Sequence, residues 1–394
     1  MKNAVIVSAC RTPMGNMLDG LAQFRASQLG GFVIKEAVRR AGIEPDVIDE
    51  VIMGHVIQGG CHQSTARQAM LYAGLPDSIP AFTVNKVCGS SMKAIMLAAQ
   101  AIKAGDGDVY VCGGHESMTN APYYLDQARS GYRLFHAELL DMMVTDGLWD
   151  IFNDFHMGNT AELVSSELNV TREDQDAFAA GSQQKATEAA EKGYFEDEIV
   201  AIEVPQRKSN PIVFDRDESI RPGTTAEKLA RLKPAFKKKD GTVTAGNASS
   251  ISDGAAAVVV MSEDKAKELG VKPMARIAGY AEGFREPEWV MMAPVIAFRR
   301  LAEKLGVAVD SWPIYEINEA FSAASVAIIR ELGLDESKVN VHGGAVALGH
   351  PIGATGARLV TTLLYAMKRY GHKSGVAGLC LGGGGSVAIA FEAL

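Results

Sequence analysis

The stretch VNKVCGSSMKAI, residues 84–95, places a cysteine between a short strand pattern and a long apolar helix pattern. The helix expected from about Ser90 to Ala104 is apolar on nearly all sides, which is typical of a buried helix. Cys88 therefore lies just before the N-terminus of a buried helix, beside Gly89, which leaves room for a ligand. The positive helix end and its free amides favour a thiolate over a thiol. The alternative role for Cys88 is that of a small buried hydrophobic residue.

Strand-like and helix-like stretches alternate outward from this segment toward both ends of the chain, which predicts an α/β fold. Each end shows a strand, a glycine-rich turn, a long helix and a further strand. A duplicated unit is one hypothesis, and the general pattern of α/β proteins is the other. We expect helices at 30–41, 90–104, 320–332 and 353–370, and strands at 4–9, 51–56, 109–112, 314–317, 339–342, 375–379 and 385–392.

The middle of the chain, from about residue 119 to 247, breaks this alternation and indicates an insertion between two halves. Within it, residues 207–240 hold ten Lys and Arg against five Asp and Glu, a local charge of +5 in an acidic chain. A solvated charged face is the ordinary explanation. The alternative is a binding surface for an anionic ligand such as a nucleotide phosphate.

The composition limits the classes of partner and compartment. The 394 residues hold 39 Lys and Arg against 47 Asp and Glu, and the net charge of −8 disfavours non-specific binding to nucleic acid or to an anionic membrane. The five cysteines form no CxxC pair and are odd in number, so they fit neither a zinc site nor a disulfide framework. The chain enters a strand pattern directly, and its apolar runs are too short to span a bilayer. We therefore expect a cytoplasmic protein without a targeting peptide.

Three further residues carry candidate chemistry. His350 lies in the glycine-rich segment 342–356, where it can act as a base near neutral pH or simply pack at a turn. Cys380 ends a strand and precedes the glycines 382–385, whose amides can stabilise a developing oxyanion; a small core residue is the alternative. Asn318 precedes another helix, and the ordinary role of an asparagine there, as an N-cap, is the alternative to a role in chemistry.

Together these segments resemble the thiolases, in particular the biosynthetic-type acetyl-CoA acetyltransferases, over essentially the whole chain. The resemblance implies the thiolase fold, with duplicated α/β halves in a five-layered αβαβα arrangement and an inserted loop domain. It implies an N-terminal half of residues 1–118 plus 250–270, an inserted loop domain of 119–249 and a C-terminal half of 271–394. The segments that carry it are 7–13, 85–90, 156–162, 244–249, 318–321, 349–356 and 380–383.

The resemblance also implies the catalytic roles. Cys88 would be the nucleophile that takes the acyl group from acetyl-CoA, and His350 would take the thiol proton and later bind the thioester oxygen. Cys380 would remove the α-proton of a second acetyl-CoA, giving an enolate that attacks the acyl-cysteine. Asn318 would hold a water that forms the enolate site together with His350. The backbone amides of Cys88 and Gly382 would form a second oxyanion hole.

The partners follow from the same resemblance. The substrate and product would be acetyl-CoA and acetoacetyl-CoA, and coenzyme A would itself be a substrate or product, so no separate cofactor and no metal are expected. The protein would be a homotetramer, a dimer of dimers, in fatty acid metabolism. The implied substrate and CoA-binding residues are His156 and Met157 near the thioester, Ser249 on the pantetheine arm, Arg221 at the nucleotide, and Ala320 and Phe321.

Other functions are weighed against this one. The nearest alternative is a broader-range 3-ketoacyl-CoA thiolase acting in the degradative direction. Cys380, where a ketoacyl synthase would have histidine, argues against that class, and the local signatures of cysteine hydrolases do not occur around Cys88. The joint presence of Cys88, His350 and Cys380 argues against a non-catalytic homologue.

Residues 290–294, VMMAP, depart from the family's usual Met-Gly-x-Gly-Pro turn near the acyl pocket. Mild oxidation would be expected to link Cys88 and Cys380.

Overall fold

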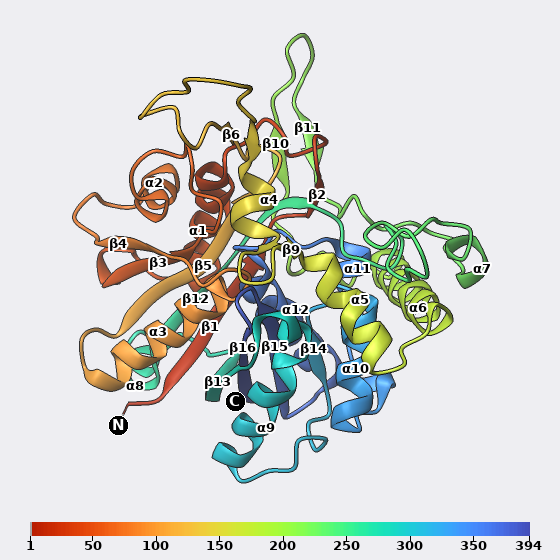
Figure 1. Cartoon of the computed structure of the whole chain (residues 1–394). Helices are drawn as coiled ribbons and strands as arrows, with labels where there is room; N and C mark the ends of the chain where they lie inside the picture. Colours follow the sequence, from red (N-terminus) through yellow and green to blue (C-terminus); the bar gives the residue numbers. More distant parts are fainter. Residues whose placement is uncertain (1) are drawn as a thin grey trace.

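The computed structural model describes residues 2–394, and its strands form two halves with the same arrangement (Figure 1). The two halves join where β1 and β13 pair through Val5–Arg276 and Ile6–Ala275, giving one sheet of ten strands. The predicted duplication is therefore present. The first half has the order β4 (Ala81–Val84), β3 (Glu50–Gly54), β5 (Val109–Ser117), β12 (Ser252–Ser262) and β1 (Ala4–Arg11), with β2 (Gly15–Asn16) paired to β12. The second half has the order β14 (Tyr315–Ile317), β15 (Ser374–Leu381), β16 (Gly385–Ala393) and β13 (Ala275–Phe284).

Helices cover both faces of both halves, which gives five layers. The central layer consists of α3 (Ser90–Ala104) and α12 (Thr355–Tyr370), whose buried side chains share one core with strands of both halves. α1 (Ala26–Ala41) and α2 (Thr65–Tyr72) cover the outer face of the first half. α9 (Ala293–Leu305) and α10 (Ser322–Leu332) cover the outer face of the second. The expected five-layered αβαβα arrangement is confirmed.

The strand expected at residues 339–342 is wrong. Only Val339 makes a bridge, a parallel one to Tyr315, after the short 3-10 helix η3 (Glu336–Lys338). Asn340 has a φ of 47°, and its side chain replaces the ladder by accepting from the Ile317 N–H and donating to the Ile317 carbonyl, both over 2.8 Å. An asparagine that bonds a neighbouring backbone in this way ends the strand.

The strand β12, between β1 and β5 in the first half, is not predicted from the sequence. All eleven of its residues are buried, and it pairs antiparallel with both β1 and β5. Its run of alanine and valine shows no alternation, because both faces of the strand are covered. Periodicity alone does not separate such a run from a buried helix.

Apart from two long helices, residues 119–247 in the middle of the chain form short elements and loops (Figure 1). The two long helices are α5 (Met157–Glu167) and α6 (Arg172–Glu191). The remaining elements here are β6 (Tyr123–Tyr124), β7 (Leu140–Asp141), α4 (Met142–Gly147), β8 (Trp149–Asp150), β9 (Phe155–His156), β10 (Ile202–Val204), β11 (Ile212–Phe214) and α7 (Ala226–Leu229). Outside it lie η1 (Pro45–Val47), α8 (Glu263–Glu268), η2 (Pro287–Met292) and α11 (Ala345–Leu348).

Candidate active site

Two helices from different halves begin at the same place in the molecule. At the first turns of α3 and α12, a Cβ atom on Gly356 would lie 2.6 Å from the backbone nitrogen of Met92, so only glycine permits this approach. The N–H of Ala357 donates to the Ser91 hydroxyl over 2.9 Å and ties the two turns together. The segments that precede these helices therefore meet between the halves, near the positive ends of both helices.

A cavity of about 590 Å³ lies at this meeting point and is lined by Cys88, His350 and Cys380. These residues are far apart in the sequence, and each enters the cavity from a different loop or strand end. The structure thus brings together the three side chains on which the predicted chemistry depends. The other predicted site residues on the lining are Gly382, His156, Met157, Arg221, Ser249, Ala320 and Phe321, while Asn318 is hydrogen-bonded to His350.

His350 is held in one tautomer by its partners. Its Nδ1 lies 2.6 Å from the Thr355 hydroxyl, which donates its own proton to the Pro351 carbonyl over 2.8 Å. Nδ1 must therefore carry the proton of the imidazole, and Nε2 accepts from the Asn318 amide at 3.3 Å. Burial, with the Arg358 guanidinium as a second cause, lowers the pKa of His350 to about 3. At neutral pH His350 is an uncharged base.

Cys88 sits on a strained turn. Val87 has a φ of 49°, a left-handed conformation that costs free energy for a β-branched residue. The Asn85 side chain accepts from the Val87 N–H over 3.0 Å. The Ser90 hydroxyl accepts from the Lys86 N–H over 2.8 Å and donates to the Val87 carbonyl over 2.6 Å. These bonds hold the cysteine in front of α3, on the lining of the cavity.

The thiolate expected at Cys88 is wrong for the free site. Burial, and next the neighbouring Cys380, raise the pKa of the Cys88 thiol well above its usual range. The backbone N–H groups of Gly382 and of Cys88 itself hydrogen-bond to the sulfur and lower the pKa, but by less. The cost of burying a charged sulfur thus outweighs the amides at the helix end. Cys88 is a thiol whose proton a neighbouring base must take.

Cys380 ends β15 with its sulfur against the thioether of Met291, 4.0 Å away. It is 6% exposed, and burial raises the pKa of its thiol to about 11. Beyond it, Gly383 and Gly384 have φ values of 82° and 81°, which favour glycine. This turn aims the Gly382 N–H at the Cys88 sulfur.

His156 is fixed at the N-terminus of α5. Its Nδ1 accepts from the Gly158 N–H over 3.0 Å, and its ring stacks on Phe236 with centroids 4.7 Å apart. A Cβ on Gly158 would lie 2.3 Å from the Phe236 ring, so glycine is required for the stack. Phe236 also packs edge-on against Phe321, with centroids 6.2 Å apart. These aromatic rings form an apolar wall of the cavity.

Ser249 and Arg221 lie on two other parts of the lining. Ser249 donates its N–H and its hydroxyl to the Ala320 carbonyl, over 3.0 and 3.1 Å, which holds the two segments side by side. Arg221 is exposed at the rim of the cavity. In the basic stretch around it, Asp217 and Glu218 turn inward, and Asp217 pairs with the buried Arg11 at 2.7 Å. The outward charge near Arg221 is therefore strongly basic.

Several lining residues were missed from the sequence. Phe236, Met118 and Leu148 all face the cavity. Each is an apolar residue without a motif, and only its tertiary contacts place it there. The position of Phe236 inside a run of lysines was the one local signal, because a large apolar residue in an exposed segment requires a partner.

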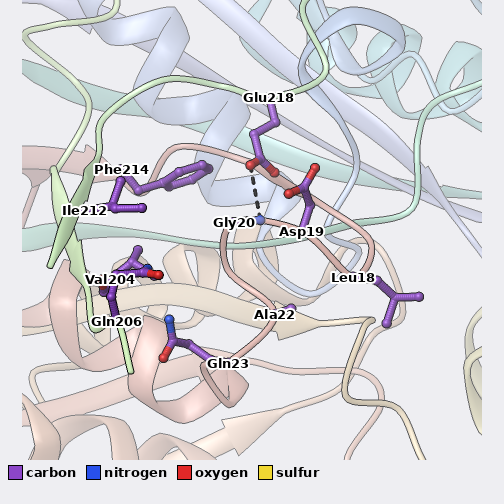
Figure 2. Close-up of a pocket in the computed structure, with 10 residues that line it drawn as sticks. All are labelled: Leu18, Asp19, Gly20, Ala22, Gln23, Val204, Gln206, Ile212, Phe214 and Glu218. Atoms are coloured by element: carbon purple, nitrogen blue, oxygen red, sulfur yellow. Dashed lines mark hydrogen bonds between the residues drawn. The ribbon is translucent and has the colours of Figure 1, made fainter. Parts of the chain in front are cut away.

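A second cavity, of about 430 Å³, lies between the loop after β2 and the β10–β11 hairpin (Figure 2). Figure 2 shows the Glu218 carboxylate accepting the Gly20 N–H, at 3.1 Å, with Asp19 beside it. Among the residues that the structure describes on its lining there is neither a cysteine nor a histidine. This cavity holds none of the residues on which the predicted chemistry depends, so it is not the candidate active site.

Within residues 2–394, no three His, Cys, Asp or Glu side chains are grouped so that they could hold a metal ion. In that same range no helix combines the length and the apolar character needed to cross a membrane. The five cysteines are free thiols.

The chain is similar to known proteins over its whole length. The family model described as "Thiolase, N-terminal domain" matches residues 4–264, and "Thiolase, C-terminal domain" matches residues 271–393. "Acetyl-CoA acetyltransferase" from Pseudomonas aeruginosa is 54% identical over 389 residues, 99% of each chain. The protein of that name from Cupriavidus necator is 52% identical over 392 residues, 100% of each chain. The crystal structure of the Bacillus anthracis acetyl-CoA acetyltransferase superposes with a TM-score of 0.98 at 46% identity, covering 100% of this chain and 99% of the other.

Proposed function

This chain belongs to the thiolase family, and we propose that it is an acetyl-CoA C-acetyltransferase. It joins two acetyl-CoA molecules reversibly into acetoacetyl-CoA and CoA through an acyl-cysteine. The observation that carries this proposal is the convergence of Cys88, His350 and Cys380 on one cavity. The names of the full-length relatives support acetyl-CoA as substrate, and nothing among them favours the degradative alternative.

The first half of the reaction forms the acyl-cysteine. His350 Nε2 takes the proton of the Cys88 thiol, and the sulfur attacks the thioester carbon of acetyl-CoA. The backbone amides of Cys88 and Gly382 stabilise the oxygen that becomes negative. The CoA thiolate leaves and takes the proton of the Cys380 thiol. The site then holds an acetylated Cys88, a protonated His350 and a Cys380 thiolate.

The second half forms the carbon–carbon bond. The Cys380 thiolate removes a proton from the methyl carbon of a second acetyl-CoA, and the pKa of about 11 makes it a strong base for a weakly acidic C–H. Protonated His350 and a water held by Asn318 stabilise the enolate oxygen. The enolate carbon attacks the acyl carbon and expels Cys88, which takes its proton back from His350. All three residues return to their starting states.

The buried Asn318 amide supports this assignment. Its Oδ1 is buried and accepts no hydrogen bond from any protein group within residues 2–394. An unpaired buried carbonyl costs free energy, so a donor at this atom is favourable when substrate is bound. The amide therefore suits the role of holding a water beside the enolate oxygen.

Trapping the intermediate tests the proposal. Incubation with acetyl-CoA should add one acetyl mass to the peptide that contains Cys88, and the protein should cleave acetoacetyl-CoA in the presence of CoA. Cys88→Ala should lose both the acetyl mass and the cleavage of acetoacetyl-CoA. Cys61 is a half-buried thiol outside the cavity lining, so Cys61→Ala should keep both. An active enzyme whose Cys88 never carries acetyl would refute the nucleophile.

The same proposal includes the cofactor requirement, the compartment and the oligomeric state of the enzyme. Coenzyme A serves as substrate and product, so no separate cofactor is needed, and the protein acts in the cytoplasm in fatty acid metabolism. It assembles as a homotetramer, a dimer of dimers, which light scattering on the eluted protein would test. Large apolar side chains exposed between residues 119 and 141 support an assembly. They are Tyr123, Leu125, Tyr132, Leu134, Phe135 and Leu139, with Phe135 90% exposed.

A further inference from the structure

The space beside the Cys380 sulfur is filled by one side chain. Met291 lies on the cavity lining, is 2% exposed, and its sulfur is 4.0 Å from Cys380 Sγ, which is van der Waals contact. In the proposed reaction, Cys380 exchanges a proton with the carbon that lies between the two carbonyls of acetoacetyl-CoA. Any substituent on that carbon must therefore pass close to Met291.

Met291 belongs to a wall of the cavity that is anchored to the protein core. It lies in η2, between Val290 and Met292, which are 1% and 3% exposed. Directly after η2, the Ala293 carbonyl accepts from the Ser386 hydroxyl over 2.8 Å, which anchors this turn to β16. The wall is part of the same apolar core as Cys380. Met291 stands where the resembled turn usually has its first glycine, so this side chain occupies space that a glycine leaves free.

The sulfur of the other cysteine faces a different wall. Cys88 packs against an apolar cluster that includes Met118 and Ile352, with Leu148 beside them. In the proposed reaction the acyl group on Cys88 lies beside this cluster, while the carbon that exchanges a proton with Cys380 lies beside Met291. A longer acyl chain and a branch on the central carbon would therefore contact different side chains.

We propose that Met291 determines the specificity of this enzyme for an unbranched central carbon, so that 2-methyl-3-ketoacyl-CoA thioesters are discriminated against. The inference rests on the proposed function, because Cys380 acts there on the central carbon. A methyl group on that carbon needs room that the Met291 thioether occupies. Closely packed side chains give way only at a cost, and one misplaced methyl group changes kcat/KM by about tenfold or more.

Thiolysis of 2-methylacetoacetyl-CoA measures this discrimination directly. Cys88 attacks the ketone carbon, the bond to the central carbon breaks, and the 2-methyl enolate takes a proton from the Cys380 thiol to leave as propionyl-CoA. Free CoA then takes the acetyl group from Cys88, so the products are propionyl-CoA and acetyl-CoA. The reference reaction on acetoacetyl-CoA gives two acetyl-CoA.

The measurement is the ratio of kcat/KM for the two substrates in wild type and three variants. Met291→Ala should raise the ratio of branched to unbranched substrate about tenfold or more. Met291→Leu, which keeps most of the volume, should leave discrimination in place. Met292→Ala is the matched control, because Met292 is equally buried in the same turn and does not line the cavity. Its ratio should equal that of wild type.

Two results would overturn the inference. One is a wild type that cleaves both substrates equally well, and the other is a ratio that Met291→Ala changes no more than Met292→Ala does. A wild type that does not cleave acetoacetyl-CoA would instead refute the proposed function. Thiolysis of 3-ketohexanoyl-CoA adds a positional check: Met291→Ala should improve it less than it improves the 2-methyl substrate, since the longer chain meets the wall near Cys88.

Discussion

The two halves of the sheet end in the same geometry and carry different side chains there. In the first half, the last register pair between β3 and β5 is Gly54–Gly114, so His55 follows one strand and Glu116 lies two residues further along the other. In the second half, the last pair between β14 and β15 is Ile317–Gly378. The corresponding positions are Asn318 and Cys380.

The first-half positions form a closed polar network. The Glu116 carboxylate accepts the N–H groups of Val56 at 3.1 Å, Ile57 at 3.2 Å and Gly353 at 2.9 Å, and it lies 3.1 Å from His55 Nε2. Its oxygens are therefore satisfied inside the protein. The bond to Gly353 crosses between the halves and fixes the loop that carries His350.

The second-half positions keep their polar atoms available. His350 Nε2 and the Cys380 sulfur line the cavity, and within residues 2–394 no protein donor reaches Asn318 Oδ1. The comparison teaches that the duplicated fold supplies two equivalent strand ends, one that holds the halves together and one that carries the proposed chemistry. Satisfied polar groups stabilise the first, and incompletely satisfied groups are available for reaction at the second.

Removing Cys380 should produce the largest effect in this comparison. We expect Cys380→Ala to lower the rate of condensation by about 10²- to 10⁴-fold, the usual worth of a positioned base. Cys88 should still become acetylated, though more slowly, because its attack uses His350 while the leaving CoA thiolate no longer finds the Cys380 proton. Rate assays measure the condensation, and the acetyl mass on Cys88 measures the acylation. Condensation at the wild-type rate would remove Cys380 from the mechanism.

The equivalent first-half substitution should act on stability instead. Glu116→Gln replaces one acceptor oxygen by a donor and leaves a buried N–H unpaired, so we expect the free energy of unfolding to fall by about 2–4 kcal/mol. Denaturant unfolding measures it. Glu331→Gln is the control, since its ion pair with Arg299 is exposed and should contribute at most about 1 kcal/mol. Equal effects from the two variants would mean that the Glu116 network does not hold the halves together.

The reactive positions could be read from the sequence because they are flanked by glycines. Cys88, His350 and Cys380 each lie beside glycine-rich turns, and the close approaches at Gly356 and Gly384 show why small residues are needed there. The pKa direction at Cys88 could not be read in this way. A helix N-terminus is visible in a sequence, whereas the burial that raises the pKa of the thiol depends on the whole fold.

The residues that hold the structure together could not be predicted from the sequence. Glu116 acquires its role from loops that only the tertiary structure brings together, and Met291 acquires its role from a cysteine on another strand. The missed strand β12 shows the same limit, since an alanine and valine run buried on both faces has no period. Asn340 could not be foreseen as a strand terminator, because its side chain replaces the ladder only when the neighbouring strand is present.

The smallest effect concerns the charge of His350, which must be neutral to take the Cys88 proton in the proposed acylation step. Because its folded pKa of about 3 lies below the unfolded value of about 6.5, only the unfolded chain gains this proton between those values. The free energy of unfolding should therefore fall as the pH drops below about 6.5, by about 2 kcal/mol from this residue at pH 5. We expect His350→Asn to lose about that much less stability than wild type between pH 7.5 and 5, as measured by denaturant unfolding at each pH. Equal losses would mean that the folded protein takes up this proton as readily as the unfolded chain, so that burial does not lower the pKa of His350.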